Sequence, residues 1–390
     1  QGVPGRRYHV GNTIPLRGDT VEPDWSVVQV DTRSVATDRV ARHSVERTVR
    51  QVMGTDSGEA KSKLRAAVIG LGWMGINHAR IYSEMRAADL VGVTDISQDV
   101  VNSVAAKYDC TAYGNIVDML RNERLDVVSV AVPTPQHSDI AHQIIEAGVN
   151  VLIEKPVAST VAEARALIDA SKANGITLGV GHVERFNPVV LGLKTVLESG
   201  EIGSLLQVSV RRIGPRPDRD RGTGVFLDLA THDVDIIRFL TGSEVSSIAS
   251  LSKNVAASRY EDLGAGLLGM SDGSQAIIIE NWVSPTKIRE ITVTGDRGML
   301  VADTITQDLF QFDNDYTISD WASIQNFRGT SEGRMIRHRL TKGEPLSLEL
   351  GAWVDSIINH TSFGVGGEDG LKALEIAIQL RDGTINGGSA

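Results

Sequence analysis

Short apolar runs alternate with helical patterns from residue 64 to about residue 181. Runs of β-branched and small residues, such as 126–132, are typical of strands that are buried on both faces of a sheet. Between these runs, apolar residues recur with a helical period. Strand and helix in alternation, with short connections, predict a parallel, doubly wound sheet. Its strands are expected at 66–69, 90–94, 111–113, 126–132, 150–153 and 177–181, and its helices at 76–85, 97–107, 116–124, 136–147 and 159–174.

The pattern changes near His182. Helices are expected at 188–199 and around 228–235, but the other apolar runs are joined by hairpin-like turn signals such as Ser271-Asp272-Gly273. These runs predict a second α/β domain with a large, open, mostly antiparallel sheet. Its strands are expected at 205–213, 265–271, 275–282, 290–294 and 299–303, and the tail returns to helix at 348–360 and 368–381.

Residues 1–60 do not share either pattern. They begin with a segment rich in Gly, Pro and Arg, and a short strand at 25–30 and a helix at 34–53 are expected in them. A remnant of a neighbouring domain, an oligomer-docking arm and a partly disordered segment stay open. The predicted division is 1–60 for this extension, 61–183 for the first domain, 184–345 for a substrate and oligomerisation domain, and 346–390 for C-terminal helices that pack back on the first domain.

Composition narrows the possible functions. The 390 residues are 41% hydrophobic and 23% charged, as in ordinary globular chains of two or three domains. A net charge of -10 makes binding to nucleic acid or to anionic membranes unfavourable. Cys110 is the only cysteine, no run of about 18 apolar residues occurs, and no signal-peptide pattern is found. We therefore expect a cytoplasmic protein.

A glycine-rich segment, Gly70-Leu71-Gly72-Trp73-Met74-Gly75, joins the first predicted strand to the first predicted helix. In a dinucleotide site the three glycines permit a tight turn, close approach of the diphosphate, and packing of helix on strand. The second strand ends at Asp95, the expected acceptor for the adenosine ribose hydroxyls. A 2′-phosphate would meet a like charge there, so NAD is favoured over NADP. A helix-capping role for Asp95 is the alternative.

Lys155, in Glu154-Lys155-Pro156, follows the predicted strand 150–153. Ligands of open α/β sheets bind at the carboxyl ends of the strands. A lysine there can donate a hydrogen bond to a substrate oxygen and stabilise negative charge that develops on it. A surface lysine in a loop is the alternative.

Asp228, His232 and Asp235 are four and three residues apart, so they share one face of the expected helix. A histidine can move a proton near neutral pH, and a carboxylate one turn away can orient its ring. Two alternatives are that Asp228 only caps the helix, and that His232 and Asp235 ligate a metal. We predict no metal site, because no cysteine or further histidine lies at ligand spacing nearby.

These motifs, together with the segment Ala131 to His137, resemble the Gfo/Idh/MocA oxidoreductase family from about Leu64 to the C-terminus. The resemblance implies a Rossmann domain followed by an open-sheet α/β domain, NAD as cofactor, and a homodimer or homotetramer formed through the open sheets. It also implies catalytic roles for Lys155, Asp228 and His232. It places Thr134, Pro135 and His137 on the nicotinamide side of the cleft. Pro133, Glu154 and Lys155 are also predicted to bind the cofactor.

A narrower similarity concerns the substrate. The segments 181–188 (GHVERFNP) and 211–215 (RRIGP) are similar to UDP-N-acetylglucosamine 3-dehydrogenases of that family. This implies oxidation of the C3 hydroxyl of a UDP-N-acetylhexosamine. The arginines at 185, 211, 212, 216, 219 and 221 could bind a diphosphate as charge-assisted forks, or could form a solvated basic loop. The residues predicted to bind substrate are Arg185, Phe186, Asn187, Arg212 and Asp235.

In the predicted mechanism, His232 takes the hydroxyl proton, Lys155 steadies the forming alkoxide and Asp228 orients the imidazole, while the hydride passes to NAD. Which of Lys155 and His232 is the formal base stays open. Two other functions also stay open. One is a dehydrogenase of a free sugar or of a cyclitol such as inositol, with structural arginines. The other is a non-catalytic NAD-binding sensor or regulator on the same fold.

Overall fold

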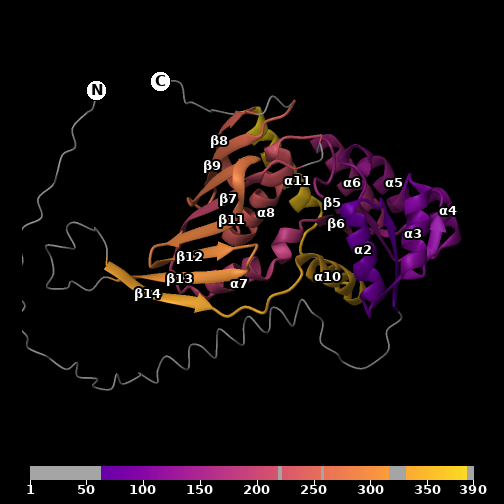
Figure 1. Ribbon diagram of the computed structural model, residues 1–390, viewed down its shortest axis with the longest axis horizontal. Coiled ribbons are helices and arrows are strands. Elements are labelled where there is room, and N and C mark those ends of the chain that lie inside the picture. Colours follow the sequence, from indigo (N-terminus) through magenta and orange to yellow (C-terminus); the bar gives the residue numbers. More distant parts are fainter. Residues whose placement is uncertain (1–62, 218–221, 256–258, 316–330, 384–390) are drawn as a thin grey trace, which may run out of the picture. The chain divides into compact units, whose positions relative to one another are not determined.

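The computed structural model describes residues 63–217, 222–255, 259–315 and 331–383 (Figure 1). Two sheets lie within these ranges, a parallel one and a mostly antiparallel one. The predicted fold class, a Rossmann domain followed by an α/β domain with a large open sheet, is confirmed. The elements expected at 25–30 and 34–53, and the arginines at 219 and 221, lie outside the described residues.

The first sheet is parallel throughout, with the strand order β3-β2-β1-β4-β5-β6. This is the order of doubly wound dinucleotide-binding folds, in which the order of the strands reverses between β1 and β4. Strand β4 has the sequence VVSV and is completely buried, as expected for a sheet covered on both faces. The strands are β1 (Leu64–Ile69), β2 (Ala88–Thr94), β3 (Thr111–Tyr113), β4 (Val127–Val130), β5 (Asn150–Glu154) and β6 (Leu178–Gly181).

Capping chemistry is clearest at helix α6 of the first domain. Helix α6 begins with a capping box, in which Thr160 and Glu163 each accept a hydrogen bond from the other's backbone N–H. It ends at Gly175, whose φ of 66° favours glycine. The helices are α2 (Trp73–Glu84), α3 (Gln98–Tyr108), α4 (Ile116–Asn122), the short η1 (Thr134–Gln136), α5 (His137–Glu146) and α6 (Val161–Asn174).

The second sheet has the strand order β14-β13-β12-β11-β7-β10-β9-β8. Its neighbours are antiparallel except for β7 and β10, which are parallel. The strands are β7 (Leu205–Pro215), β8 (Val245–Lys253), β9 (Leu263–Met270), β10 (Gln275–Asn281), β11 (Val283–Gly295), β12 (Gly298–Asp303), β13 (Asp308–Asp315) and β14 (Ser331–His338).

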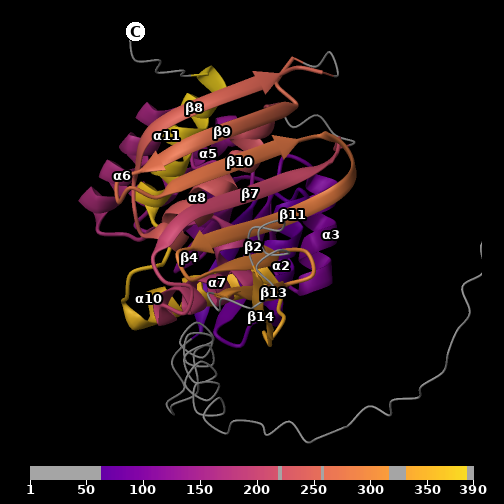
Figure 2. The same ribbon diagram turned by 90° about the vertical axis from the view of Figure 1, so that its left-hand side faces the viewer.

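Helices lie on one face of this sheet, behind the strands in Figure 2. They share a core with the inward residues of the strands, for example Val208 and Ile278. The last helix also contributes Leu371 and Leu374 to the core of the first domain, and the helix before it contributes Trp353. The C-terminal segment therefore belongs to both cores. The helices are η2 (Val183–Phe186), α7 (Pro188–Ser199), η3 (Phe226–Ala230), α8 (Thr231–Thr241), α10 (Pro345–Asn359) and α11 (Gly367–Asp382).

Three strands were not predicted, namely β8, β13 and β14, and β11 begins well before the predicted strand at 290–294. Strand β8 has the sequence VSSIASLSK, in which serines replace most of the apolar residues that would mark a strand. Strand β13 is bounded by aspartates and carries Phe310 and Phe312 on one face with Gln311 buried on the other. The alternation is therefore reversed at Gln311 and Phe312, although Leu309 is buried on the inner face as an apolar residue.

Candidate active site

The glycine loop between β1 and α2 leaves room for a diphosphate. Gly70 has a φ of 86°, which favours glycine, and a Cβ at Gly75 would lie 1.7 Å from the Gly70 carbonyl oxygen. At Gly72, in contrast, a Cβ would meet nothing within 4 Å. The side chain of Leu71 is buried in the core, and that of Met74 is half-buried against it. The loop thus fits a diphosphate at the N-terminus of α2.

Asp95 stands at the end of β2, next to this loop. Its Oδ2 accepts a 2.6 Å hydrogen bond from the N–H of Leu71, and its Oδ1 accepts a 2.9 Å bond from the N–H of Ser97. The carboxylate therefore joins the glycine loop to the start of α3. The adjacent residues Trp73 and Ile96 expose 68% and 97% of their surface. Such apolar surface beside a ribose acceptor fits the adenosine part of a dinucleotide.

The other residues predicted to bind the cofactor lie after β4 and at the end of β5. Pro133 is exposed and Thr134 is half-buried. The imidazole of His137 is buried, and each ring nitrogen lies 2.9 Å from a backbone carbonyl oxygen of the loops that follow these two strands. Glu154 is also buried, with Oε1 3.0 Å from Nε2 of His78. The side chains of His137 and Glu154 are thus already bonded within the protein.

Lys155 follows β5 and reaches Asp228 in η3, a single π-type turn directly before α8. Its Nζ donates a 3.0 Å hydrogen bond to Oδ1 of Asp228 and a 2.7 Å bond to the backbone carbonyl of the same residue. The two side chains are 14% and 10% exposed. Turns of this type are rare and often found at functional sites. Here the turn presents Oδ1 and the backbone carbonyl oxygen of Asp228 to the Lys155 ammonium.

His232 lies in the first turn of α8. Burial lowers the pKa of His232 well below its usual value, and the charges of Lys155 and Arg212 lower it further. The ring is therefore neutral at physiological pH and can accept a proton. The sequence led us to expect that Asp228 orients this ring. In the structure the Asp228 carboxylate accepts from Lys155 instead, and Nδ1 of His232 has no hydrogen-bond partner among the described residues.

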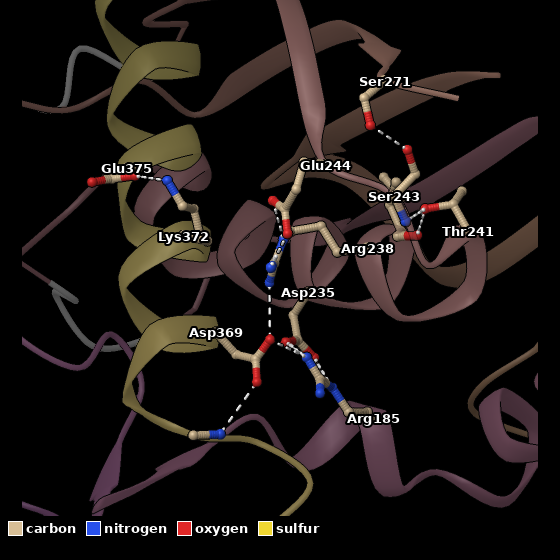
Figure 3. A network of polar contacts seen from close by, with 12 residues as sticks. Arg185, Asp235, Arg238, Thr241, Ser243, Glu244, Ser271, Asp369, Lys372 and Glu375 are labelled. Carbon is tan, nitrogen blue, oxygen red and sulfur yellow. Dashed lines mark hydrogen bonds and ion pairs between the residues drawn. The ribbon is translucent and has the colours of Figure 1, made fainter. Parts of the chain in front are cut away.

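Arg185 and Asp235, both predicted to bind substrate, are bonded to each other. Figure 3 shows the Arg185 guanidinium between Asp235 and Asp369. Nε and Nη2 donate to the two oxygens of Asp235, Nη1 donates to the carbonyl of Gly364, and Asp369 also accepts from Arg238. This network joins η2, α8 and α11. It fixes the helix that carries His232, and it leaves the Arg185 fork already occupied.

The other three predicted substrate residues are buried as well. Phe186 stacks on Phe363 with ring centroids 5.7 Å apart. Asn187 is the N-cap of α7, since its Oδ1 accepts from a backbone N–H in the first turn. Arg212 donates a 2.7 Å hydrogen bond to Asp233 and also pairs with a half-buried glutamate of η2. The structure therefore places these side chains in the framework of the site.

Two further features were not predicted. His182 is buried beside His232, with ring centroids 6.4 Å apart. Glu280 is also buried, and burial raises its pKa well above the usual value, with a further increase from Asp233. The charge of Arg212, which pairs with Asp233, acts in the opposite direction and lowers the pKa of Glu280. The sequence signal for Glu280 was its position two residues after Ile278, which places both on the inward face of the predicted strand 275–282.

This arrangement combines an ordered ammonium, a neutral imidazole and a loop shaped for a dinucleotide. Such groups can remove a proton from a hydroxyl, stabilise the alkoxide and present the carbon to a hydride acceptor. Within the described ranges no set of His, Cys, Asp or Glu side chains could hold a metal ion. No helix in the same ranges combines the length and apolarity needed to cross a membrane. Fold and site together define a dinucleotide-dependent oxidoreductase.

Two family models match the chain in turn. Residues 64–182 match the oxidoreductase family model with an NAD-binding Rossmann fold, and residues 190–301 match the C-terminal domain of the same family. The chain belongs to the Gfo/Idh/MocA oxidoreductase family, and its first domain is an NAD-binding Rossmann domain.

Similar proteins act on sugars and cyclitols. UDP-N-acetylglucosamine 3-dehydrogenase of Acidithiobacillus ferrooxidans is 26% identical over 82% of this chain and 96% of its own. A solved structure of that enzyme has a TM-score of 0.73 and 25% identity, covering 83% of this chain and 97% of its own. An inositol 2-dehydrogenase of Rhizobium meliloti is 26% identical over 80% of this chain and 94% of its own. The WlbA dehydrogenase of Bordetella pertussis, solved with NADH and UDP-GlcNAcA, has a TM-score of 0.68 and 21% identity, covering 83% of this chain and 97% of its own.

Proposed function

We propose that this protein oxidises the C3 hydroxyl of a UDP-N-acetylhexosamine with NAD, giving the 3-keto sugar. The observation that carries the proposal is the bond of Lys155 to Asp228, next to a neutral His232 and at the carboxyl end of the NAD-binding sheet. The nucleotide sugar is supported by the similarity to the Acidithiobacillus enzyme, which extends over 82% of the chain.

In the proposed reaction His232 takes the hydroxyl proton. Lys155 donates a hydrogen bond to the forming alkoxide, and Asp228 holds the Lys155 ammonium in place before the substrate arrives. NAD, when bound, supplies the hydride acceptor. Because His232 is neutral and Lys155 is held by a carboxylate, we assign the base to His232 and the electrostatic role to Lys155.

In this proposal the residues predicted to bind substrate do not contact it, and they support the site from the protein interior. Arg185 and Arg212 are paired with aspartates, so neither guanidinium is free for a diphosphate. The diphosphate would instead bind exposed cations at the end of β7. Arg216 is exposed just after this strand, and Lys287 is exposed and packs against Gly214 of the strand.

A panel of substrates tests the proposal. UDP-N-acetylglucosamine, UDP-glucose, N-acetylglucosamine and myo-inositol are each supplied with NAD, and NADH absorbance is followed. We expect turnover with UDP-N-acetylhexosamines and little with the free sugars. Arg216→Ala with Lys287→Ala should raise KM for the nucleotide sugar by about tenfold or more, because each charged contact contributes roughly 1.5–3 kcal/mol. Equal activity on the free sugar would contradict the nucleotide-sugar assignment.

A dehydrogenase of a cyclitol is the second candidate. One observation favours it, namely that the two buried arginines of the site are already neutralised by aspartates. In that case myo-inositol supports the higher kcat/KM, and the Arg216→Ala and Lys287→Ala double variant leaves that value unchanged. Binding of NAD without turnover of any compound would instead support the sensor hypothesis.

A further inference from the structure

The ring of His182 lies next to the ring of His232, the proposed base, in an edge-to-face arrangement. His182 follows β6 and is fully buried, and neither of its ring nitrogens has a hydrogen-bond partner among the described residues. The buried Nδ1 of His232 also has none. A neutral imidazole carries one donor and one acceptor nitrogen, and leaving such groups unpaired in the interior costs free energy. Three such atoms in one place therefore point to a polar group that joins them.

The distance between the rings suits one water molecule. The centroids are 6.4 Å apart, and the ring planes are inclined by 85°. Ring nitrogens lie roughly 1 Å from the centroid, so the nearest pair is at least about 4 Å apart, too far for a direct hydrogen bond. A single water that makes two bonds of about 2.8 Å spans a gap between nitrogens of up to about 5.6 Å, which this arrangement of the rings allows.

The charged groups around these rings all have hydrogen-bond partners, which for Arg212 is Asp233 and for Arg289 are the backbone carbonyls of Ile213 and Ile288. Those that act on His182 are Asp235, Arg185, Lys155 and Asp369. Those that act on His232, besides His182 itself, are Lys155, Arg212 and Arg289. Lys155 is bonded to Asp228, and Arg185, Asp235 and Asp369 form the network in Figure 3. That network anchors η2 directly after His182, so it also holds the His182 ring in place.

We propose that His182 is a positioning residue for His232, and that a water molecule bonded to both rings accepts the Nδ1–H of His232 and donates to a ring nitrogen of His182. This arrangement keeps the His232 proton on Nδ1 and leaves Nε2 free to accept a proton. The catalytic consequence rests on the proposed function. The tautomer of His232 does not rest on the proposed function, because it can be measured in the NAD-bound enzyme without any substrate.

Nitrogen NMR of the NAD-bound protein, with isotope-labelled histidine, tests the tautomer. The His232 signal is identified from its loss in His232→Asn. We expect a single tautomer protonated at Nδ1 in the parent protein and a mixture of tautomers in His182→Phe. His182→Asn, which keeps a polar side chain, should retain most of the parent tautomer. The same tautomer population in the parent and in His182→Phe would overturn the proposal.

Kinetics give a second measurement. In His182→Phe we expect kcat to fall about tenfold or more, since general base catalysis depends on the protonation state of one nitrogen, while KM for NAD stays unchanged. His182→Asn should recover part of kcat. His142→Phe, on α5 and remote from the loop and the bonded groups of the site, is the matched control and should keep the parent kcat. If His182→Phe fails to bind NAD, His182→Asn decides, and a loss of Nδ1 protonation there would contradict the proposal. Absence of turnover in the parent would contradict the proposed function while leaving the NMR test intact.

Discussion

At the scale of single residues, Lys155 is held by two oxygens of one aspartate. The carboxylate and the backbone carbonyl of Asp228 both accept from its ammonium. An ammonium that is ordered before substrate binding loses little further entropy when charge develops next to it, so it can act fully in the transition state.

Lys155→Ala should therefore lower kcat by about 10²–10³, the usual cost of removing one preorganised donor. Binding of NAD should remain nearly unchanged, because the glycine loop does not depend on this side chain. Calorimetric NAD titration and NADH production measure the two effects. Lys63→Ala, which removes an exposed ion pair with Asp89, serves as the control and should keep the parent rate. A Lys155→Ala variant with more than half of the parent activity would contradict the assigned role.

A second residue, Glu349 on α10, affects stability rather than chemistry. It is completely buried, and burial raises its pKa well above its usual value of 4.5, with further increases from Glu154 and Asp235. Above pH 4.5 the unfolded chain releases this proton while the folded protein keeps it. Folding then takes up a proton, so the free energy of unfolding falls as pH rises, by up to about 1.4 kcal/mol per pH unit.

Glu349→Gln removes this titration. Its stability relative to the parent should therefore increase between pH 5 and pH 9, by up to about 1.4 kcal/mol per unit in the range below the folded-state pKa. Urea unfolding at several pH values measures the difference. Glu198→Gln, at a side chain that is 67% exposed, should show no such trend. Equal slopes for the parent and Glu349→Gln would mean that Glu349 is ionised in the folded protein.

Sequence reasoning identified Lys155, Asp228 and His232 because motif, spacing and strand end all pointed to them. It could not separate a ligand-binding arginine from a buried one. Arg185 and Arg212 have the residue type of a diphosphate fork, and only the folded chain shows that Asp235 and Asp233 occupy them. His182 was quoted within its segment but carried no chemical signal of its own, because its neighbour His232 is distant in sequence.

At the scale of elements, the alternation of strands and helices in the first domain was predictable, since most of its parallel strands contain a short apolar run; the short, partly exposed β3 is the exception. The second sheet was predictable where its strands are apolar runs joined by a turn signal, as in β9 and β10. The π-type turn η3 has no sequence signal that we recognise. It nevertheless directs the carboxylate and the backbone carbonyl of Asp228 toward Lys155.

We expect the turn from β2 into α3 to set the preference for NAD over NADP. Asp95 stands at the position that would meet a 2′-phosphate, and the exposed Ile96 follows it. Asp95→Ser combined with Ile96→Arg should lower the preference for NAD over NADP or invert it, because the repulsion is removed and a cation is added. Kinetics with both cofactors measure the ratio, and Ile96→Ala alone should leave the preference for NAD. A parent enzyme that already prefers NADP would contradict the role of Asp95.

At the scale of the whole molecule, the second sheet presents an apolar outer face on β8, β9 and β10. Leu251, Leu267 and Ile279 expose 71%, 57% and 38% of their surface. Leu251 is paired with Ala265, and Ala265 with Ile279, so the apolar residues continue from strand to strand. An apolar face of this kind marks an interaction surface.

We expect this face to pair with the same face of a second copy, giving a dimer or tetramer. Light scattering at micromolar concentration should then report a multiple of the 41.9 kDa protomer mass. Leu251→Lys with Leu267→Lys should give monomers, because it places charges inside the contact, whereas Ile305→Lys in the turn after β12 should not. A parent protein that is a strict monomer and still turns over substrate would refute the pairing.

The parallel pairing of β7 with β10 also has a consequence for how the protein is made. The connection from Pro215 to Gln275 contains η3, α8, β8 and β9, so Asp228 and His232 lie within the loop that this pairing closes. Pairing of distant segments is slow, because the entropy of the intervening chain is lost before the contacts form. A chain on the ribosome will therefore have completed its cofactor loop long before β10 emerges. The core of the first domain, however, is completed only when α10 and α11 are made, so the cofactor loop and the catalytic helix reach their final packing together at the end of synthesis.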